Sequence, residues 1–378
     1  MKFSKARIWL DVIAVLASFA FAASWAATQA RSMRDQSAVA RVTAEKKTLC
    51  VGRYLIDVPA KSEVSFTGIM LNGFDIVTNK ETETAFRKRV EEREAEIAAD
   101  RGNATSSSEG PMETARDLRV PGMVGRTLIY GRSRSYLMAG ERRVDFESVS
   151  VEVHAHVKGI SFSLAARSTE DASVEEAELL LARLRIRRED EIPAEAGFCV
   201  PGAVFADPLP AHKNEHVVMH LEFADYPDLS VQLMTLAGAR PGPGLLARVA
   251  RAGAGTGVED LLRMTTLRKG KRSIGGIDGE ELLLRARAFN RTTTYGFNWE
   301  APGAVDDPAL PLLSMELKAG IRERSVGKPV NSSLHEDALL NLWDSIASSI
   351  RPRKATANPL QVQRAEHPVH LAQQQPAH

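Results

Sequence analysis

This chain of 378 residues lacks several features that mark common classes of protein. It has two cysteines, so no more than one intramolecular disulfide can form, and a thiol enzyme is disfavoured. It contains no Gly-x-Ser-x-Gly nucleophile elbow and no Walker-type phosphate loop. Neither sign of charge dominates, because 49 lysines and arginines accompany 48 aspartates and glutamates. Since the net charge is +1 and the basic cluster 268–272 is predicted to be a solvated loop, we expect no nucleic-acid partner.

The N-terminal segment, in contrast, is typical of an export signal. Basic residues at positions 2, 5 and 7 precede an apolar run, Val12–Ala23. Small residues around Ser24–Ala26 or Thr28–Ala30 fit a cleavage site. The uncharged run is shorter than the ~20 residues that a membrane-spanning helix needs. We therefore predict a signal peptide, residues 1–30, with an uncleaved inner-membrane anchor as the alternative. Both interpretations place the rest of the chain outside the cytoplasm, in the periplasm.

A repeat organises the rest of the chain. The decapeptide Cys50–Pro59 has a looser copy at Cys199–Pro208. This pattern predicts one unit copied twice, with domains at 48–187 and 198–353, each with its own sheet and closing helix. Further matches follow in the same order, at offsets that grow slowly and never reverse: Gly122 and Gly125 with Gly276 and Gly279, Glu152 with Glu316, and Ile186 with Ile350.

The two cysteines occupy equivalent positions in the two copies. An exported chain meets conditions in which thiols oxidise, so a Cys50–Cys199 disulfide would join the two domain entrances. The alternative is a pair of small side chains buried in separate cores. The residues leave both interpretations open.

Runs of strands with few helices between them predict an α+β fold of two similar domains. Each domain is expected to be a mainly antiparallel sheet with helices packed on one face. Residues 31–47, polar and alanine-rich, are interpreted as a tether, 188–197 as a linker and 354–378 as a disordered tail. Strands are predicted at 54–58, 63–71, 74–77, 125–130, 144–157, 160–165, 215–223, 229–235, 281–288, 293–299 and 312–319. Helices are predicted at 81–100, 174–184, 336–350 and, with a Gly-rich break, 245–264.

Two groups of histidines are candidates for metal binding or catalysis. His212 and His216 match the H-x-x-E-H pattern of inverted zinc proteases, which requires a helix, but the residues that follow alternate as in a strand. His154 and His156 share one face of a predicted strand, where we expect them to face solvent, and no third metal ligand can be named. The segment Gly242–Gly244 is predicted to be a turn into a helix and not a dinucleotide loop. We therefore expect no catalytic, cofactor-binding or metal-binding residues and no cofactor.

Several segments resemble one known family. They are Thr48–Pro59, Gly197–Val200, Asn214–Phe223 and Tyr226–Leu229, and the likeness extends over about 48–353. They resemble the two-domain immunity proteins that neutralise class-4 lipase effectors of the type VI secretion system, the Tli4-like family.

The resemblance implies a periplasmic, non-enzymatic inhibitor whose two domains form a claw. Such a claw would grip the lid region of a phospholipase effector in an inter-domain cleft, and no contact residue can be carried over. We expect an apolar centre in the claw, surrounded by charges. The alternatives are an exported envelope scaffold or an exported hydrolase that uses His154 or His216.

Overall fold

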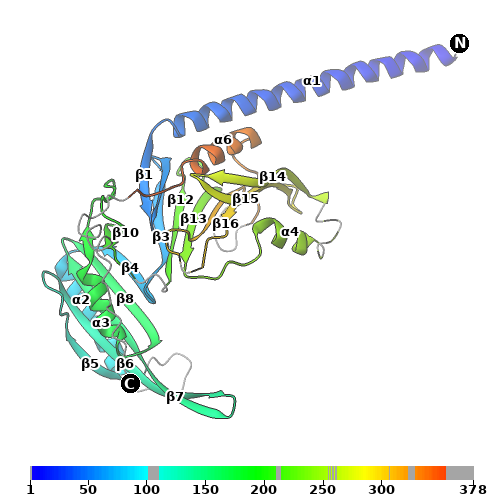
Figure 1. The fold of residues 1–378 in the computed structure, drawn as a ribbon. Coiled ribbons are helices and arrows are strands. Elements are labelled where there is room, and N and C mark those ends of the chain that lie inside the picture. Colours follow the sequence, from blue (N-terminus) through cyan, green and yellow to red (C-terminus); the bar gives the residue numbers. More distant parts are fainter. Residues whose placement is uncertain are drawn as a thin grey trace, which may run out of the picture.

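Twelve strands form one antiparallel sheet that passes through both halves of the molecule, and the whole curves into an open claw (Figure 1). The computed structural model describes residues 2–100, 110–209, 214–253, 255, 257, 259, 262–305, 307–321 and 328–354. The predicted disordered tail, apart from Lys354, lies outside these residues.

Helices and strands follow each other in a similar order in the two halves. The N-terminal half contains α1 (Lys2–Val42), β1 (Lys46–Val51), β2 (Tyr54–Pro59), β3 (Glu63–Leu71), β4 (Phe74–Lys80), α2 (Glu83–Ala99), β5 (Met112–Asp117), β6 (Val124–Ala139), β7 (Arg142–Val157), β8 (Ile160–Thr169), α3 (Ser173–Ala182) and β9 (Leu184–Ile186). The C-terminal half contains β10 (Gly197–Val200), β11 (Ala203–Ala206), β12 (Glu215–Glu222), β13 (Leu229–Ala237), α4 (Leu245–Gly253), β14 (Met264–Ile274), β15 (Ile277–Arg287), β16 (Thr293–Ala301), β17 (Leu312–Ala319), α6 (Glu336–Ala347) and β18 (Arg351–Pro352).

The strand order confirms the predicted duplication. The large sheet runs β5-β6-β7-β8-β4-β3 through the N-terminal half and continues β12-β13-β17-β16-β15-β14 through the C-terminal half. The expectation of two separate sheets is wrong, because the edge strands β3 and β12 pair with each other in antiparallel register. Thr67 and Val218, which pair near the middle of this junction, mark an approximate two-fold axis.

The register corrects one of the sequence matches. Glu152 lies on β7, whereas Glu316 lies on β17, the counterpart of β8. Leu128 and Leu282 each follow a matched glycine by three residues, and they pair with Glu152 and Asn298, respectively. The counterpart of Glu152 is therefore Asn298.

Two small sheets exchange strands between the halves. β18, from the end of the C-terminal half, completes the sheet β1-β2-β18, and β9 completes the sheet β10-β11-β9. Arg351 pairs with Leu55 on β2 as Arg185 pairs with Val204 on β11. Each half is therefore completed by the terminal strand of the other.

A disulfide and an ion-pair cluster join the halves. Cys50 and Cys199, both buried, form a disulfide with a Cα–Cα distance of 5.8 Å. Arg53 donates to Glu215 at 2.6 and 2.7 Å and to Asp207 at 2.8 and 2.9 Å. Burial alone would lower the pKa of Arg53, but its hydrogen bonds to these carboxylates raise it. The arginine therefore stays charged within the junction.

Helices cover both faces of the sheet, so the prediction of one covered face is wrong. Val151 and Val153 of β7 belong to the main core with Leu181 of α3, whereas His156 on the opposite face stacks on Phe86 of α2. In the C-terminal half, Trp343 of α6 packs edge to face against Phe297 of β16, with ring centroids 5.9 Å apart. On the other face, Glu280 of β15 accepts the backbone N–H of Leu246 in α4 at 2.8 Å. α2 and α4 therefore pack on the polar residues that alternate with the core residues along each strand.

Local signals located most elements but missed the outer edges of the sheet. The predicted Asn72-Gly73 turn is confirmed, since both residues have positive φ values of 57° and 87°. The segment 245–264, expected to be helical with a Gly-rich break, forms α4 as far as Gly253, the first glycine of that break. The cluster 268–272, expected to be a solvated loop, lies on β14, where Arg268 and Arg272 pair with Glu281 and Asp344.

The segment interpreted as a tether is largely helical. α1 continues to Val42 and projects far beyond the body of the molecule at its other end (Figure 1). Within the part of the chain that the structure describes, no helix combines the length and the hydropathy needed to cross a membrane.

Candidate functional site

Between α2 and α4, one face of the sheet has no helix on it, and we call this surface the central strip. Cross-strand pairing places Glu300, Ser314, Met234, Val218 and Thr67 in one row that starts beside α4. The strip consists of the residues of five strands that point to this face: Asp75, Val77, Asn79, Glu63, Ser65, Thr67, His216, Val218, His220, Glu222, Ser230, Gln232, Met234, Ser314, Glu316 and Lys318.

The central strip is mainly polar. Thr67 hydrogen-bonds His220 across the junction at 2.8 Å, and Lys318 pairs with Glu316 at 2.8 Å. A hollow of about 640 Å³ opens beside these residues, and Glu63 and Glu222 line it from directly paired positions. The expectation of an apolar centre is therefore wrong for this surface, because the strand positions opposite the core carry mostly polar residues.

Exposed apolar residues lie instead at the end of the β6–β7 hairpin. Five large side chains there are each more than a third exposed: Tyr136, Leu137, Met138, Val144 and Phe146. Leu137 pairs with Val144, and Phe146 pairs with Ser135, so these side chains share one face of the hairpin, which also carries Arg142 at its tip. The opposite face carries the ion pairs Arg134–Glu147 and Arg143–Asp145, and Arg143 also covers the Tyr136 ring at 4.2 Å.

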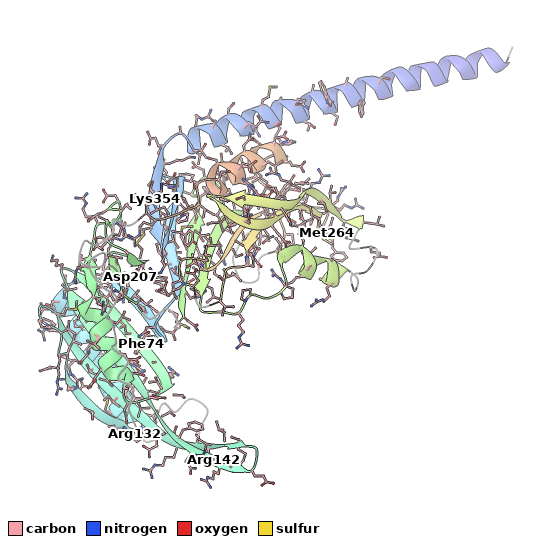
Figure 2. The ribbon with its side chains drawn as sticks, in the orientation of Figure 1. Phe74, Arg132, Arg142, Asp207, Met264 and Lys354 are labelled. Carbon is pink, nitrogen blue, oxygen red and sulfur yellow. A yellow bond between two sulfur atoms is a disulfide. The ribbon has the colours of Figure 1, made fainter. Side chains whose placement is uncertain are left out.

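The C-terminal half presents a smaller counterpart. The turn between β15 and β16 exposes 79% of Phe289, and Arg263 lies over its ring at 4.1 Å. Figure 2 labels Arg142 at the tip of the N-terminal hairpin and Met264 at the far end of the C-terminal half, on opposite sides of the claw's opening. The two ends of the claw therefore both carry an arginine-covered aromatic ring.

The sequence did not mark these hairpin residues as an exposed apolar surface. It predicted strands at 125–130 and 144–157, which include Val144 and Phe146, but nothing for the residues between them. The available signal was the alternation of Val144 and Phe146 with Arg143, Asp145 and Glu147, which continues the strand pattern toward the turn.

His154 and His156 are buried, which corrects the expectation that they face solvent. α2 covers them from a distant part of the sequence, and the Nε2 atom of His156 lies 3.0 Å from the Glu81 carbonyl. Since that group is a carbonyl, the ring nitrogen is the donor. His154 lies between Glu152, at 3.0 Å, and the Ser163 hydroxyl, at 2.8 Å.

The Glu152–His154–Ser163 order is that of a hydrolase triad, but the surroundings do not provide the rest of such a site. Both edges of β8 are paired at Ser163, with β4 and β7, so its backbone N–H is not available as an oxyanion donor. Burial would raise the pKa of Glu152, but hydrogen bonds from His154, Arg93 and Tyr130 lower it well below the usual range. These contacts describe a buried structural cluster.

The other candidate residues for metal or cofactor binding do not form a site either. His212 lies outside the described residues, and His216 lies on strand β12, not on a helix. Within the described ranges, no group of three histidine, cysteine or acidic residues could hold a metal ion. Gly244 leads into α4, whose Leu246 N–H is already bonded to Glu280.

Comparisons with known proteins agree with this architecture. The Tle cognate immunity protein 4 N-terminal domain matches residues 47–185, and the C-terminal domain of the same family matches 191–355. The immunity protein TplEi of the type VI secretion system from Pseudomonas aeruginosa, complexed with "L" peptide, is 26% identical with a TM-score of 0.63, over 82% of this chain and 98% of that chain. Its apo structure is 25% identical with a TM-score of 0.65 and the same coverage.

A Tle4–Tli4 complex contains a further match, 25% identical with a TM-score of 0.66, over 83% of this chain and 99% of that chain. No curated protein matches. Because the two family domains together span most of the chain in the expected order, the chain belongs to the Tle cognate immunity protein 4 family.

Proposed function

We propose that this protein is a periplasmic, non-enzymatic immunity protein that binds the lipase effector of its own type VI secretion system and prevents the opening of the effector's lid. The observation that carries the proposal is the presence of both family domains in one claw-shaped sheet. A solved Tle4–Tli4 complex supports effector binding by a relative.

The two ends of the claw and the central strip are the proposed contact surface. Apolar side chains at the hairpin end, Leu137, Val144 and Phe146, would contact apolar residues of the partner. The polar strip would supply hydrogen bonds and select between cognate and non-cognate effectors. Spread over both ends, such a contact can reach the ~1,600 Å² of a stable complex, and we expect a dissociation constant of about nanomolar order.

The test is a lipase assay with the purified cognate effector and the purified mature protein. An equimolar amount of wild type should abolish lipase activity and form a complex on size exclusion. Phe146→Asp should weaken binding by about tenfold or more, because it replaces an exposed apolar ring of the hairpin end with a charge. The matched control is Leu179→Asp, which changes an exposed leucine on α3, away from the claw's ends, and should bind as wild type does.

Unchanged effector activity together with no complex would refute the immunity role. Equal binding by wild type and Phe146→Asp would refute the assigned contact surface and leave the immunity role standing. Hydrolysis of the effector's lipid substrate by this protein alone would refute the non-enzymatic part.

A further inference from the structure

The part of α1 from Phe21 to Arg31 and the part from Ser32 to Val42 differ sharply in their contacts. From Phe21 to Arg31 every side chain is exposed, with Phe21 at 76% and Trp25 at 61%. From Ser32 onward a buried face appears at helical spacing, with Ser32, Asp35 and Val39 each at most 5% exposed. The folded body therefore begins within one residue of Arg31.

The contacts of this second part are specific. Ser32 donates to the carboxylate of Asp337 at 2.6 Å, and Asp35 accepts the backbone N–H of His335 at 3.0 Å. Arg31 donates to the carbonyl of Ser332 at 3.0 Å. All three bonds tie α1 to the start of α6, so residues 31–42 form a clasp over that helix.

A second signal lies in the sequence of the clasp. Ser32-Met-Arg-Asp35 has the spacing of a capping box, in which a serine and an acidic residue three positions later satisfy the first N–H groups of a helix. Inside a continuous helix these N–H groups are already bonded to carbonyls of the preceding turn. A capping box at Ser32 can stabilise the helix only if the chain begins just before it.

The exposed part of α1 has no comparable role in the fold. A helix that projects aromatic side chains into water gains no tertiary packing, which is the main source of helix stability in proteins. Its residues Thr28 and Ala30 offer small side chains at the positions that a signal peptidase reads, three residues and one residue before the cut.

We infer that signal peptidase cleaves the chain between Ala30 and Arg31, and that the new N-terminus is the clasp on α6. This inference rests on the export that the proposed function requires. A cut after Ala26 would leave four exposed residues ahead of the clasp, whereas a cut after Ala30 leaves none ahead of it. The reaction is hydrolysis of one peptide bond, in which water supplies a proton to the new amine of Arg31 and a hydroxyl to the new carboxyl of Ala30.

The test is expression of the full chain in a Gram-negative host, followed by fractionation, intact mass and N-terminal sequencing. The expected product is periplasmic, shorter by the first 30 residues, and begins Arg-Ser-Met. Ala30→Lys should abolish this product, because the position before the cut must be small. The matched control, Gln29→Lys, adds the same charge one residue earlier and should still be cut at the same bond.

Three outcomes would overturn the inference. A periplasmic product that begins at Ala27 or beyond Ser32, or one that retains residues 1–30, refutes the cleavage site without affecting the immunity role. Normal processing of Ala30→Lys also refutes it. Retention of the uncleaved wild type in the cytoplasm instead refutes the proposed compartment.

Discussion

The two halves share one strand order but differ in how the second face of the sheet is covered. In the N-terminal half, α2 has 17 residues and buries Phe86, Val90 and Ile97 against the sheet. In the C-terminal half, α4 has nine residues and buries none. The comparison shows that the main core lies on the face covered by α3 and α6, with Val39 of α1, and that α4 adds no buried residue to the other face.

The largest expected effect on stability comes from the disulfide, which links the equivalent cysteines of the two halves. Replacing both Cys50 and Cys199 with serine should lower the free energy of unfolding by up to about 5 kcal/mol, because the bond closes a loop of about 150 residues in the unfolded chain. Chemical denaturation of the oxidised wild type and the double variant measures the difference. A loss confined to one half, seen as two separate transitions, would contradict the symmetric role.

The second-largest effect distinguishes the contributions of α2 and α4 to the free energy of unfolding. Phe86→Ala should lower the free energy of unfolding by about 3 kcal/mol, since it leaves a cavity in place of the buried ring. Val249→Ala in α4 should cost less than about 1 kcal/mol, because that side chain is only partly buried. Equal losses in urea denaturation would show that α4 stabilises its half as much as α2 does.

A third prediction uses the counterparts Glu152 and Asn298, of which only the first titrates. Glu152→Gln should cost about 2 kcal/mol at neutral pH, because it removes hydrogen bonds made by a charged group. The pKa of Glu152 is lowered in the folded state, so its stabilising effect is present above the ordinary carboxyl pKa and is lost as pH falls through the lowered value.

The measurement is the melting temperature of wild type and Glu152→Gln from pH 7 down to the lowest pH at which both fold. The difference between the two should shrink below about pH 4. A difference that stays constant over this range would show that burial, not the charge of Glu152, determines its contribution.

The smallest effect concerns the two exchanged strands. Arg351 on β18 pairs with Asp57 at 3.0 Å, whereas its counterpart Arg185 on β9 donates to the carbonyls of Ala182 and Leu184. Arg351→Ala should therefore cost about 0.5 kcal/mol, the usual range for a partly exposed ion pair, and Arg185→Ala less. Thermal melts of the two variants, run in parallel at low and high salt, test this order.

The prediction from sequence succeeded where the determinant is local. Alternating residues located Glu63–Leu71 and Leu312–Ala319 with the observed bounds, and the Asn72-Gly73 pair located a hairpin. It failed for β5 and β14, because edge strands carry charged residues on both faces and resemble loops. The pairing of β3 with β12 has no local signal, since it joins residues far apart in the sequence.

For the candidate site, too, the sequence predicted what depends on neighbouring residues and not what depends on distant ones. The alternation at His154 and His156 placed them on one face of a strand, but their burial depends on α2, which lies about 60 residues earlier in the chain. The resemblance at Thr48–Pro59 predicted the family, and the duplicated order predicted the two halves. Neither could locate the apolar hairpin end, because its extent depends on how far β6 and β7 continue past their neighbours.

The exchange of β9 and β18 makes completion of the fold depend on the order of synthesis. The N-terminal half is synthesised first, yet the strand that finishes its small sheet, β18, lies at the end of the C-terminal half. A chain that stops before Arg351 leaves β2 with an open edge, however well the rest has formed. The small sheet of the first half therefore stays incomplete until nearly all of the second half is present.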